Sequence, residues 1–270
     1  MRTYEWVKKW AGRLAELRIP LYAGNTAFFL LLSLLPLASL LFAVLQWTTL
    51  EETDVLRFLA QVSPEALLPL FEDLLSGLYD VQPVSLLSIS AITLVWSGSK
   101  GVYSLLQGLN AVNSCRETRG YLRLRLLCMV CTAAMLLALV LTLLLNVYGK
   151  ALLRLLTGSG GWFDSLLTFS MKYLHLYSTA FLMLVFAVFY LVLPNRTARL
   201  SRVLPGALAA AAAWNLFSSA LSLYVDHFPR ASSLYGSLTL VLLSLLWLYI
   251  CISIIFYGAV FNRLLERRFG

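Results

Sequence analysis

The chain has 270 residues, of which 60% are hydrophobic and 13% charged, with a net charge of +8 and a mean hydropathy of +0.81. Soluble domains carry about 25% charged residues, so this composition excludes a water-soluble globule and indicates a helical membrane protein whose apolar exterior lipid covers. In such a protein the placement of the positive charges carries more information than their sum.

Residues 1–20 form the first predicted element, an amphipathic helix at the cytoplasmic interface. Trp6, Trp10, Leu14 and Leu17 fall on one face of this helix. Tryptophan at this level is typical of an interfacial anchor, and a docking site for a cytoplasmic partner is the alternative. The apolar run that follows is too long for a cleaved signal peptide, so we expect it to remain as a membrane span.

Six apolar segments are each long enough to cross the hydrocarbon core, which requires about 20 residues. We therefore predict an all-α fold, a single membrane domain over residues 1–270 with six transmembrane helices. The predicted spans are 21–47, 84–106, 126–148, 176–193, 203–225 and 238–260.

Lysine and arginine residues gather on one side of these spans. The N-terminus, the loops after the second and fourth spans, and the C-terminus together carry 15 of them, whereas the other connections carry 5. The excess assigns the first group to the cytoplasm. We expect both termini inside the cell.

The connection over residues 48–83 is acidic and too long for a simple turn. Ser63 and Pro64 have the pattern of an N-cap followed by the first helical residue, and leucines then recur at helical spacing. We expect an amphipathic helical hairpin on the external face. Residues 51–80 would be the surface for any envelope partner.

Acidic and histidine side chains are absent from the interior of the predicted spans. His175 and His227 both fall at or beyond the external boundary. This pattern gives no support to a paired-histidine haem or a carboxylate proton relay. Cys128 and Cys131 open an apolar helix, where we expect them to pack rather than to act in redox chemistry. We predict no cofactor and no metal.

Lys100 is the one charged residue within a predicted span. It follows Trp96 and Ser97 and precedes a glycine. One interpretation is a lysine near the cytoplasmic end of the span that snorkels to the interface. The other is a fixed cation in a cavity, which meets an anionic substrate or a lipid phosphate.

The first span carries Pro36 after Asn25 and Ser33. A proline inside a helix frees a backbone carbonyl and bends the helix. Broken spans of this kind mark substrate sites in some transporters, although they also occur in spans without that role.

Small and polar residues form stripes on the last two spans. Asn215, Ser218 and Ser222 are spaced by three and four and therefore share one face of the fifth span. Such stripes favour close helix packing, and a polar pathway along the fifth span is the alternative. The stripe of the sixth span consists of Ser237, Ser244, Cys251 and Gly258.

Short motifs follow one another in a specific order along nearly the whole chain. They are Ala27-Phe28-Phe29 with Ser33 and Pro36, Trp96-Ser97 with Lys100-Gly101 and Asn110, Pro194-Asn195, Pro205-Gly206, Tyr235-Gly236, and Gly258-Ala259 with Asn262. The set resembles the YihY/BrkB family of bacterial inner-membrane proteins, once labelled ribonuclease BN. The resemblance implies six spans, an inner-membrane location and an unsettled activity.

The chain departs from the family pattern at Val260, where many members carry a glutamate. Any role that depends on that carboxylate is therefore in doubt here. The candidates for a substrate path are Asn25, Ser33, Pro36, Trp96, Ser97, Lys100, Asn110, Asn215, Ser218, Ser222 and Tyr235.

The old ribonuclease label can be tested on the residues. Metal-dependent hydrolysis of a phosphodiester needs clustered histidine or carboxylate ligands. The carboxylates on the predicted cytoplasmic side, Glu5, Glu16, Glu117 and Glu266, are dispersed along the chain. The sequence therefore argues against an enzyme and against a nucleic-acid partner, because topology and anionic lipid explain the arginines.

Two functions remain as hypotheses. The first is a transporter or lipid-handling protein for an amphiphilic or anionic substrate, with Lys100 at its anionic group and membrane lipids as partners. The second is a scaffold that does not transport and that recruits an envelope protein through residues 51–80. The sequence leaves the oligomeric state open.

Overall fold

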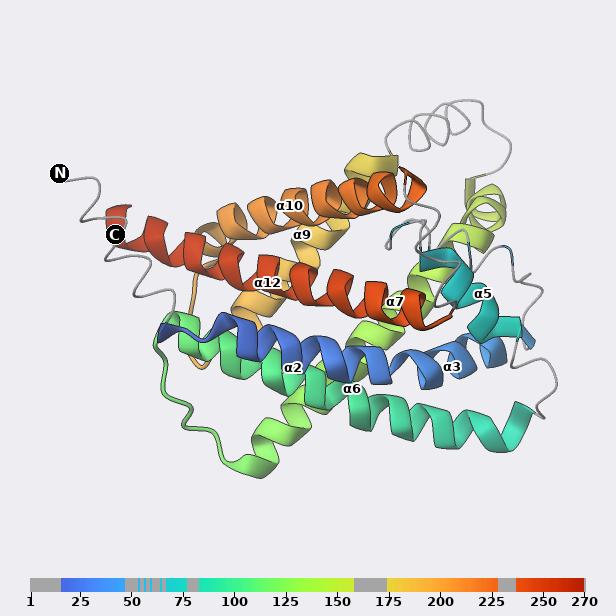
Figure 1. Ribbon diagram of the computed structural model, residues 1–270, viewed down its shortest axis with the longest axis horizontal. Coiled ribbons are helices and arrows are strands. Elements are labelled where there is room, and N and C mark those ends of the chain that lie inside the picture. Colours follow the sequence, from blue (N-terminus) through green and yellow to red (C-terminus); the bar gives the residue numbers. More distant parts are fainter. Residues whose placement is uncertain are drawn as a thin grey trace.

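The computed structural model describes residues 16–46, 67–76, 83–157, 174–227 and 237–269, and isolated positions between 53 and 64. All regular structure in these ranges is helical, which confirms the predicted all-α class for them (Figure 1). The helices are α2 (Ile19–Leu32), α3 (Leu34–Gln46), α5 (Leu68–Ser76), α6 (Pro83–Asn113), α7 (Tyr121–Thr157), α9 (Leu174–Val192), α10 (Leu200–His227) and α12 (Ser237–Phe269).

Four stretches of the described chain are long and apolar enough to cross a membrane by length and composition. They are Ile19–Leu40, Tyr121–Val140, Leu200–Tyr224 and Thr239–Arg267, and Thr179–Val192 is a shorter apolar helix. Helix α6 is not among them, because serines, glycines and Lys100 lower its hydropathy. The described residues thus contain four candidate membrane spans, and composition does not confirm the predicted number of six.

Several helices extend beyond the predicted spans, among them α7, which continues to Thr157 instead of ending at residue 148. Helix α6 continues to Asn113 instead of ending at residue 106, and α12 continues to Phe269 instead of ending at residue 260. The predicted spans end where each apolar run ends, whereas the helices continue beyond it. A helix continues through polar residues as long as its backbone hydrogen bonds are maintained.

The first predicted span is divided into α2 and α3 by a turn at Ser33. Pro36 has no N–H for the carbonyl of Leu32, and its ring crowds that carbonyl, so the helix is interrupted one turn before the proline. The Ser33 hydroxyl donates to the carbonyl oxygen of Leu30 at 2.7 Å. The predicted interruption is confirmed.

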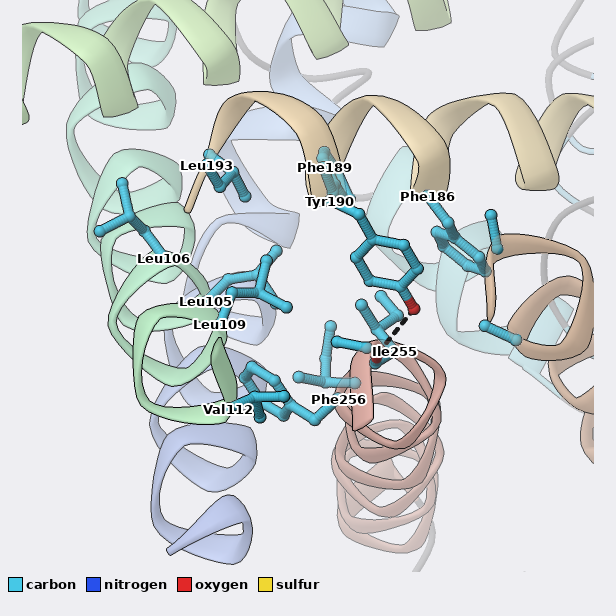
Figure 2. Close-up of a cluster of buried hydrophobic side chains, with 14 of the residues drawn as sticks. Leu105, Leu106, Leu109, Val112, Phe186, Phe189, Tyr190, Leu193, Ile255 and Phe256 are labelled. Atoms are coloured by element: carbon cyan, nitrogen blue, oxygen red, sulfur yellow. Dashed lines mark hydrogen bonds between the residues drawn. The ribbon is translucent and has the colours of Figure 1, made fainter. Parts of the chain in front are cut away.

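One end of the bundle, here called the basic end, contains the starts of α2 and α10 and the ends of α6, α9 and α12 (Figure 1). The main hydrophobic core lies toward this end and joins buried side chains from α2, α6, α7, α9, α10 and α12. Figure 2 shows the Tyr190 hydroxyl of α9 donating to the carbonyl oxygen of Ile255 on α12, at 2.6 Å. Phe256 is fully buried beside this contact.

Helices α10 and α12 cross at Gly206 and Gly258. A Cβ atom at Gly258 would lie 2.8 Å from the carbonyl oxygen of Gly206, so only glycine permits this approach. Asn262 bridges the crossing: its Oδ1 accepts from the Gly206 amide at 2.6 Å, and its Nδ2 donates to the carbonyl of Val203 at 3.0 Å. These bonds satisfy backbone groups beside Pro205, which disturbs the start of α10.

Helix α5 is the described part of the predicted external hairpin. It begins at Leu68 rather than at Pro64, and Ser63 lies outside the described residues. The segment is more than a surface helix, because Leu67 is 1% exposed and packs with Leu221 and Trp247 inside the bundle. Its apolar side fills the space between α3 and α12, both of which it contacts.

Candidate functional site

Lys100 lies near the middle of α6. The helix ends at Asn113, thirteen positions further along the chain, which corresponds to about 20 Å along the axis. Its Nζ atom lies 5.4 Å from the ring centroid of Phe29 and 5.9 Å from that of Trp96. Both distances fall within the range of cation–π attraction, so aromatic rings of α2 and α6 hold the ammonium group.

Arg125 of α7 lies against the same tryptophan. The Cζ atom of Arg125 is 4.4 Å from the Trp96 ring centroid, and its Nη2 donates to the Trp96 carbonyl at 3.4 Å. The Nε of Arg125 is buried without a hydrogen-bond partner. Trp96 itself is 53% exposed. Lys100, Arg125, Trp96 and Phe29 are together called the Lys100–Arg125 site.

Two glycines beside Lys100 bring its neighbouring helices close. A Cβ atom at Gly98 would lie 2.9 Å from the Cγ2 of Thr132 on α7. A Cβ at Gly101 would lie 3.4 Å from Leu30 and 3.5 Å from the Thr26 carbonyl oxygen of α2. The glycines on either side of Lys100 therefore allow α7 to pack closely on one side of α6 and α2 on another.

Neither cation of the Lys100–Arg125 site contacts a carboxylate among the residues that the structure describes. The ion pairs Arg119–Glu117 and Arg196–Glu266, each at 2.8 Å, join residues at the basic end. Two positive groups that share one ring favour an anion between or beside them. The arrangement is chemically suited to holding an anionic group.

Asn25 of α2 contacts α6 at Ser104, one helical turn along from Lys100. Its Nδ2 donates to the Ser104 hydroxyl at 3.2 Å, and that hydroxyl donates to the Tyr22 carbonyl at 3.2 Å. The Oγ1 of Thr26 is buried without a partner in the same α2–α6 interface. Among the predicted path residues, the structure brings Asn25, Trp96, Ser97 and Lys100 into one region. The Ser97 hydroxyl itself donates to the Thr93 carbonyl at 2.8 Å.

Asn110 belongs to a different group at the basic end. Its Nδ2 donates to Glu117 at 2.7 Å, and its Oδ1 accepts from the Asn195 amide at 2.8 Å. Arg119 binds both oxygens of the Glu117 carboxylate. These bonds from Arg119 lower the pKa of Glu117 to about 2, against the smaller opposing effect of burial. The network ties the loop after α6 to the end of α9.

The polar stripe of the predicted fifth span lies on α10 and faces neighbouring helices. Asn215 donates to Thr179 of α9 at 2.7 Å, and the Trp247 indole of α12 donates to Ser218 at 3.1 Å. Ser222 is half-buried on the same helix. On α12, the stripe residues Ser244, Cys251 and Gly258 are buried. These contacts favour the packing interpretation of both stripes.

The remaining path candidates are separate from Lys100. Ser33 bonds within its own turn, and Pro36 is half-buried in α3 beyond the bend. Tyr235 lies outside the described residues, as do residues 1–15 of the N-terminal helix predicted over 1–20 and most of the hairpin predicted over 48–83. No structural position is assigned to them.

The predicted path omitted two residues of the site, Phe29, which appeared only in a family motif, and Arg125. Arg125 was assigned to the loop after the second span because the apolar run starts at residue 126, whereas α7 begins at Tyr121. Gly120, whose carbonyl accepts the Leu124 amide, gave a usable signal for the earlier start, since glycine often precedes a helix. No local sequence pattern predicted the contact between Arg125 and Trp96.

Comparisons with known proteins match the chain to one family and to membrane proteins of several bacteria. The family model described as "Virulence factor BrkB" matches residues 11–270. The putative ribonuclease-like protein YfkH of Bacillus subtilis is 30% identical over 91% of this chain and 90% of its own length. A UPF0761 membrane protein of Tolumonas auensis is 26% identical over 96% of this chain and 83% of its own length. A UPF0761 membrane protein of Aromatoleum aromaticum is 24% identical over 98% of this chain and 64% of its own length.

No solved structure matches the chain. Within the described ranges, no three histidine, cysteine or acidic residues lie close enough together to hold a metal ion.

Proposed function

We propose that this chain, which belongs to the BrkB family of membrane proteins, transports or otherwise handles an amphiphilic anion of the lipid class. The observation that carries the proposal is the position of Lys100, near the middle of a long helix and held by aromatic rings. A charge at such a depth is costly unless it meets a counter-charge. An anionic substrate supplies that charge.

The surface around Lys100 favours an amphiphilic substrate over a small hydrophilic ion. Trp96 is half-exposed, and Ile92 and Leu126 nearby on α6 and α7 are exposed apolar residues. Ile92 and Leu126 offer contacts for hydrocarbon and no hydrogen bonds for a hydrated ion, and Trp96 offers a single donor, its indole N–H. The proposal assigns no hydrolytic activity to the chain.

The proposal includes a topology of six spans in a bacterial inner membrane with both termini in the cytoplasm. Helices α6 and α9 would be the spans beyond the four that composition alone supports. Both pack against those helices, α6 on α2 and α7, and α9 on α10. The excess of lysine and arginine at the basic end supports the cytoplasmic orientation of that end. Cysteine labelling of single-cysteine variants at residues 119 and 267 in intact cells tests the orientation.

The function is tested by transbilayer movement of fluorescent phospholipids in proteoliposomes. The wild type is compared with Lys100→Ala, with Lys100→Arg and with Arg202→Ala, which removes an exposed cation of the basic end. We expect Lys100→Ala to reduce movement about tenfold or more, and the other two variants to retain it. If the wild type moves no lipid above protein-free vesicles, lipid transport is excluded. Equal movement by Lys100→Ala removes Lys100 from the mechanism.

A scaffold that recruits an envelope partner is the second candidate, and α5 is the feature that favours it. Glu72 and Asp73 are exposed on this helix, while Leu67 and Leu70 anchor it in the bundle. Deleting the segment would remove this anchor, so reversal of the two charges is the sharper test. A scaffold would lose its partner in a pull-down from envelope extracts when both acids are changed to lysine. A transporter without such a partner would keep its lipid flux.

A further inference from the structure

We infer that the Lys100–Arg125 site binds the phosphate of an anionic glycerophospholipid, which enters sideways from the bilayer where α7 crosses α6. The inference rests on the proposed function and names its substrate class. It adds Arg125 as a second ligand for the headgroup and Trp96 as the contact between headgroup and acyl chain. Figure 1 shows α7 crossing α6 obliquely, with the start of α7 projecting away from the other helices.

The cations come from two helices but contact one ring. The ammonium of Lys100 and the guanidinium of Arg125 lie 5.9 Å and 4.4 Å from the centroid of Trp96. Neither has a carboxylate partner among the residues described. Two like charges fixed around one side chain repel each other, and a phosphate group placed beside both removes this repulsion.

Arg125 also retains unused hydrogen-bond donors. Its Nη2 makes a long bond of 3.4 Å to the Trp96 carbonyl, and its Nε is buried without a partner. A planar guanidinium presents donors in the geometry that matches phosphate oxygens. Since a buried donor without a partner costs free energy, an anion that reached it would be held by a charge-assisted hydrogen bond.

The surroundings distinguish a lipid from a free phosphate ion. Ile92 precedes Trp96 by one turn of α6, and Leu126 and Val130 follow Arg125 on α7, and all three are exposed. Helix α7 packs chiefly on α6 among the described elements, so these side chains face the region that acyl chains occupy. A lipid uses both the cations and this apolar surface. An inorganic anion uses only the cations.

Binding is measured on the purified full chain in phosphatidylcholine nanodiscs, with phosphatidylglycerol brominated in its acyl chains as the probe. Bromine quenches tryptophan at short range, and the difference between the wild type and Trp96→Phe isolates the signal of Trp96. We expect saturable quenching by brominated phosphatidylglycerol, and only weak, non-saturable quenching by brominated phosphatidylcholine, whose choline offsets the phosphate charge.

The variant Lys100→Gln with Arg125→Gln is expected to bind about tenfold more weakly, because it loses the charge-assisted bonds. The matched control Arg199→Gln with Arg202→Gln removes two exposed cations of the basic end instead. It is expected to retain the preference for phosphatidylglycerol, and it serves as the control for folding and for net charge. Equal binding by the glutamine variant, or quenching that does not distinguish the two lipids, overturns the site.

Inorganic phosphate separates the two sources of the anion. Phosphate at millimolar concentration is expected to leave the quenching unchanged at constant ionic strength. Displacement of the lipid by phosphate alone overturns the assignment to lipid in favour of a free anion. Binding of phosphatidylglycerol without its movement in the proteoliposome assay overturns the proposed transport but not the binding site. Movement of lipid by the glutamine variant at the wild-type rate shows that the site is not part of the transport path.

Discussion

The crossing of α10 and α12 gives the sharpest prediction of stability. In Gly206→Ala, the new Cβ would overlap the carbonyl oxygen of Gly258 and lie 2.5 Å from the Cγ of Asn262. Neither group moves easily, because one is helix backbone and the other makes two hydrogen bonds to α10. The helices must therefore separate, and the bond from the Gly206 amide to Asn262, 2.6 Å long, must lengthen or break.

The size of the effect follows from three contributions. Overpacking of a tight interface costs about 1–3 kcal/mol, and a weakened buried hydrogen bond costs about 1 kcal/mol more. Alanine returns up to about 1 kcal/mol through its helix propensity. We expect a net destabilisation of about 2 kcal/mol, which for a chain of this size lowers the midpoint of thermal unfolding by roughly 4–8 °C.

The assay is the fraction of detergent-purified protein that remains monodisperse after heating. Gly24→Ala is the matched control, since a Cβ there meets nothing within 4 Å, and we expect its midpoint to equal or exceed that of the wild type. A Gly206→Ala protein as stable as Gly24→Ala would refute the reasoning, because it would mean that α10 and α12 separate without loss.

Three further predictions concern the basic end. The folded pKa of Glu117, lowered to about 2, means that its pair with Arg119 stabilises the wild type over Glu117→Gln at neutral pH. This advantage is lost as the pH falls from about 4.5 toward 2. A difference in melting midpoint between the wild type and Glu117→Gln that stays constant across that range would contradict the prediction. Reversing Glu266 to arginine breaks its pair with Arg196. The double exchange Arg196→Glu with Glu266→Arg restores a pair of opposite charges, and we expect it to recover about 1 kcal/mol of the free energy of unfolding, as a double-mutant cycle would measure. Tyr190→Phe removes the 2.6 Å bond to the Ile255 carbonyl and should cost about 1–2 kcal/mol, so an unchanged midpoint would show that this bond contributes nothing.

The sequence by itself determined the all-α class and the approximate place of each described helix. Apolar runs of about 20 residues predict helices because lipid leaves every backbone group to be satisfied within its own segment. The break at Ser33 was also predictable, since Pro36 removes a specific backbone bond. Lys100 stood out for the same kind of local reason, as a charge inside an apolar run.

Only the tertiary structure decided which residues meet. Trp96 and Arg125 are far apart in sequence and come together because Gly98 lets α7 cross α6 closely. Asn110, a candidate path residue by its motif, turned out to bond Glu117 and Asn195, and Leu67 of the acidic loop turned out to be buried beside Trp247. The physical reason is that faces toward lipid and faces toward protein are equally apolar in a membrane, so hydrophobic pattern alone does not specify how the helices cross.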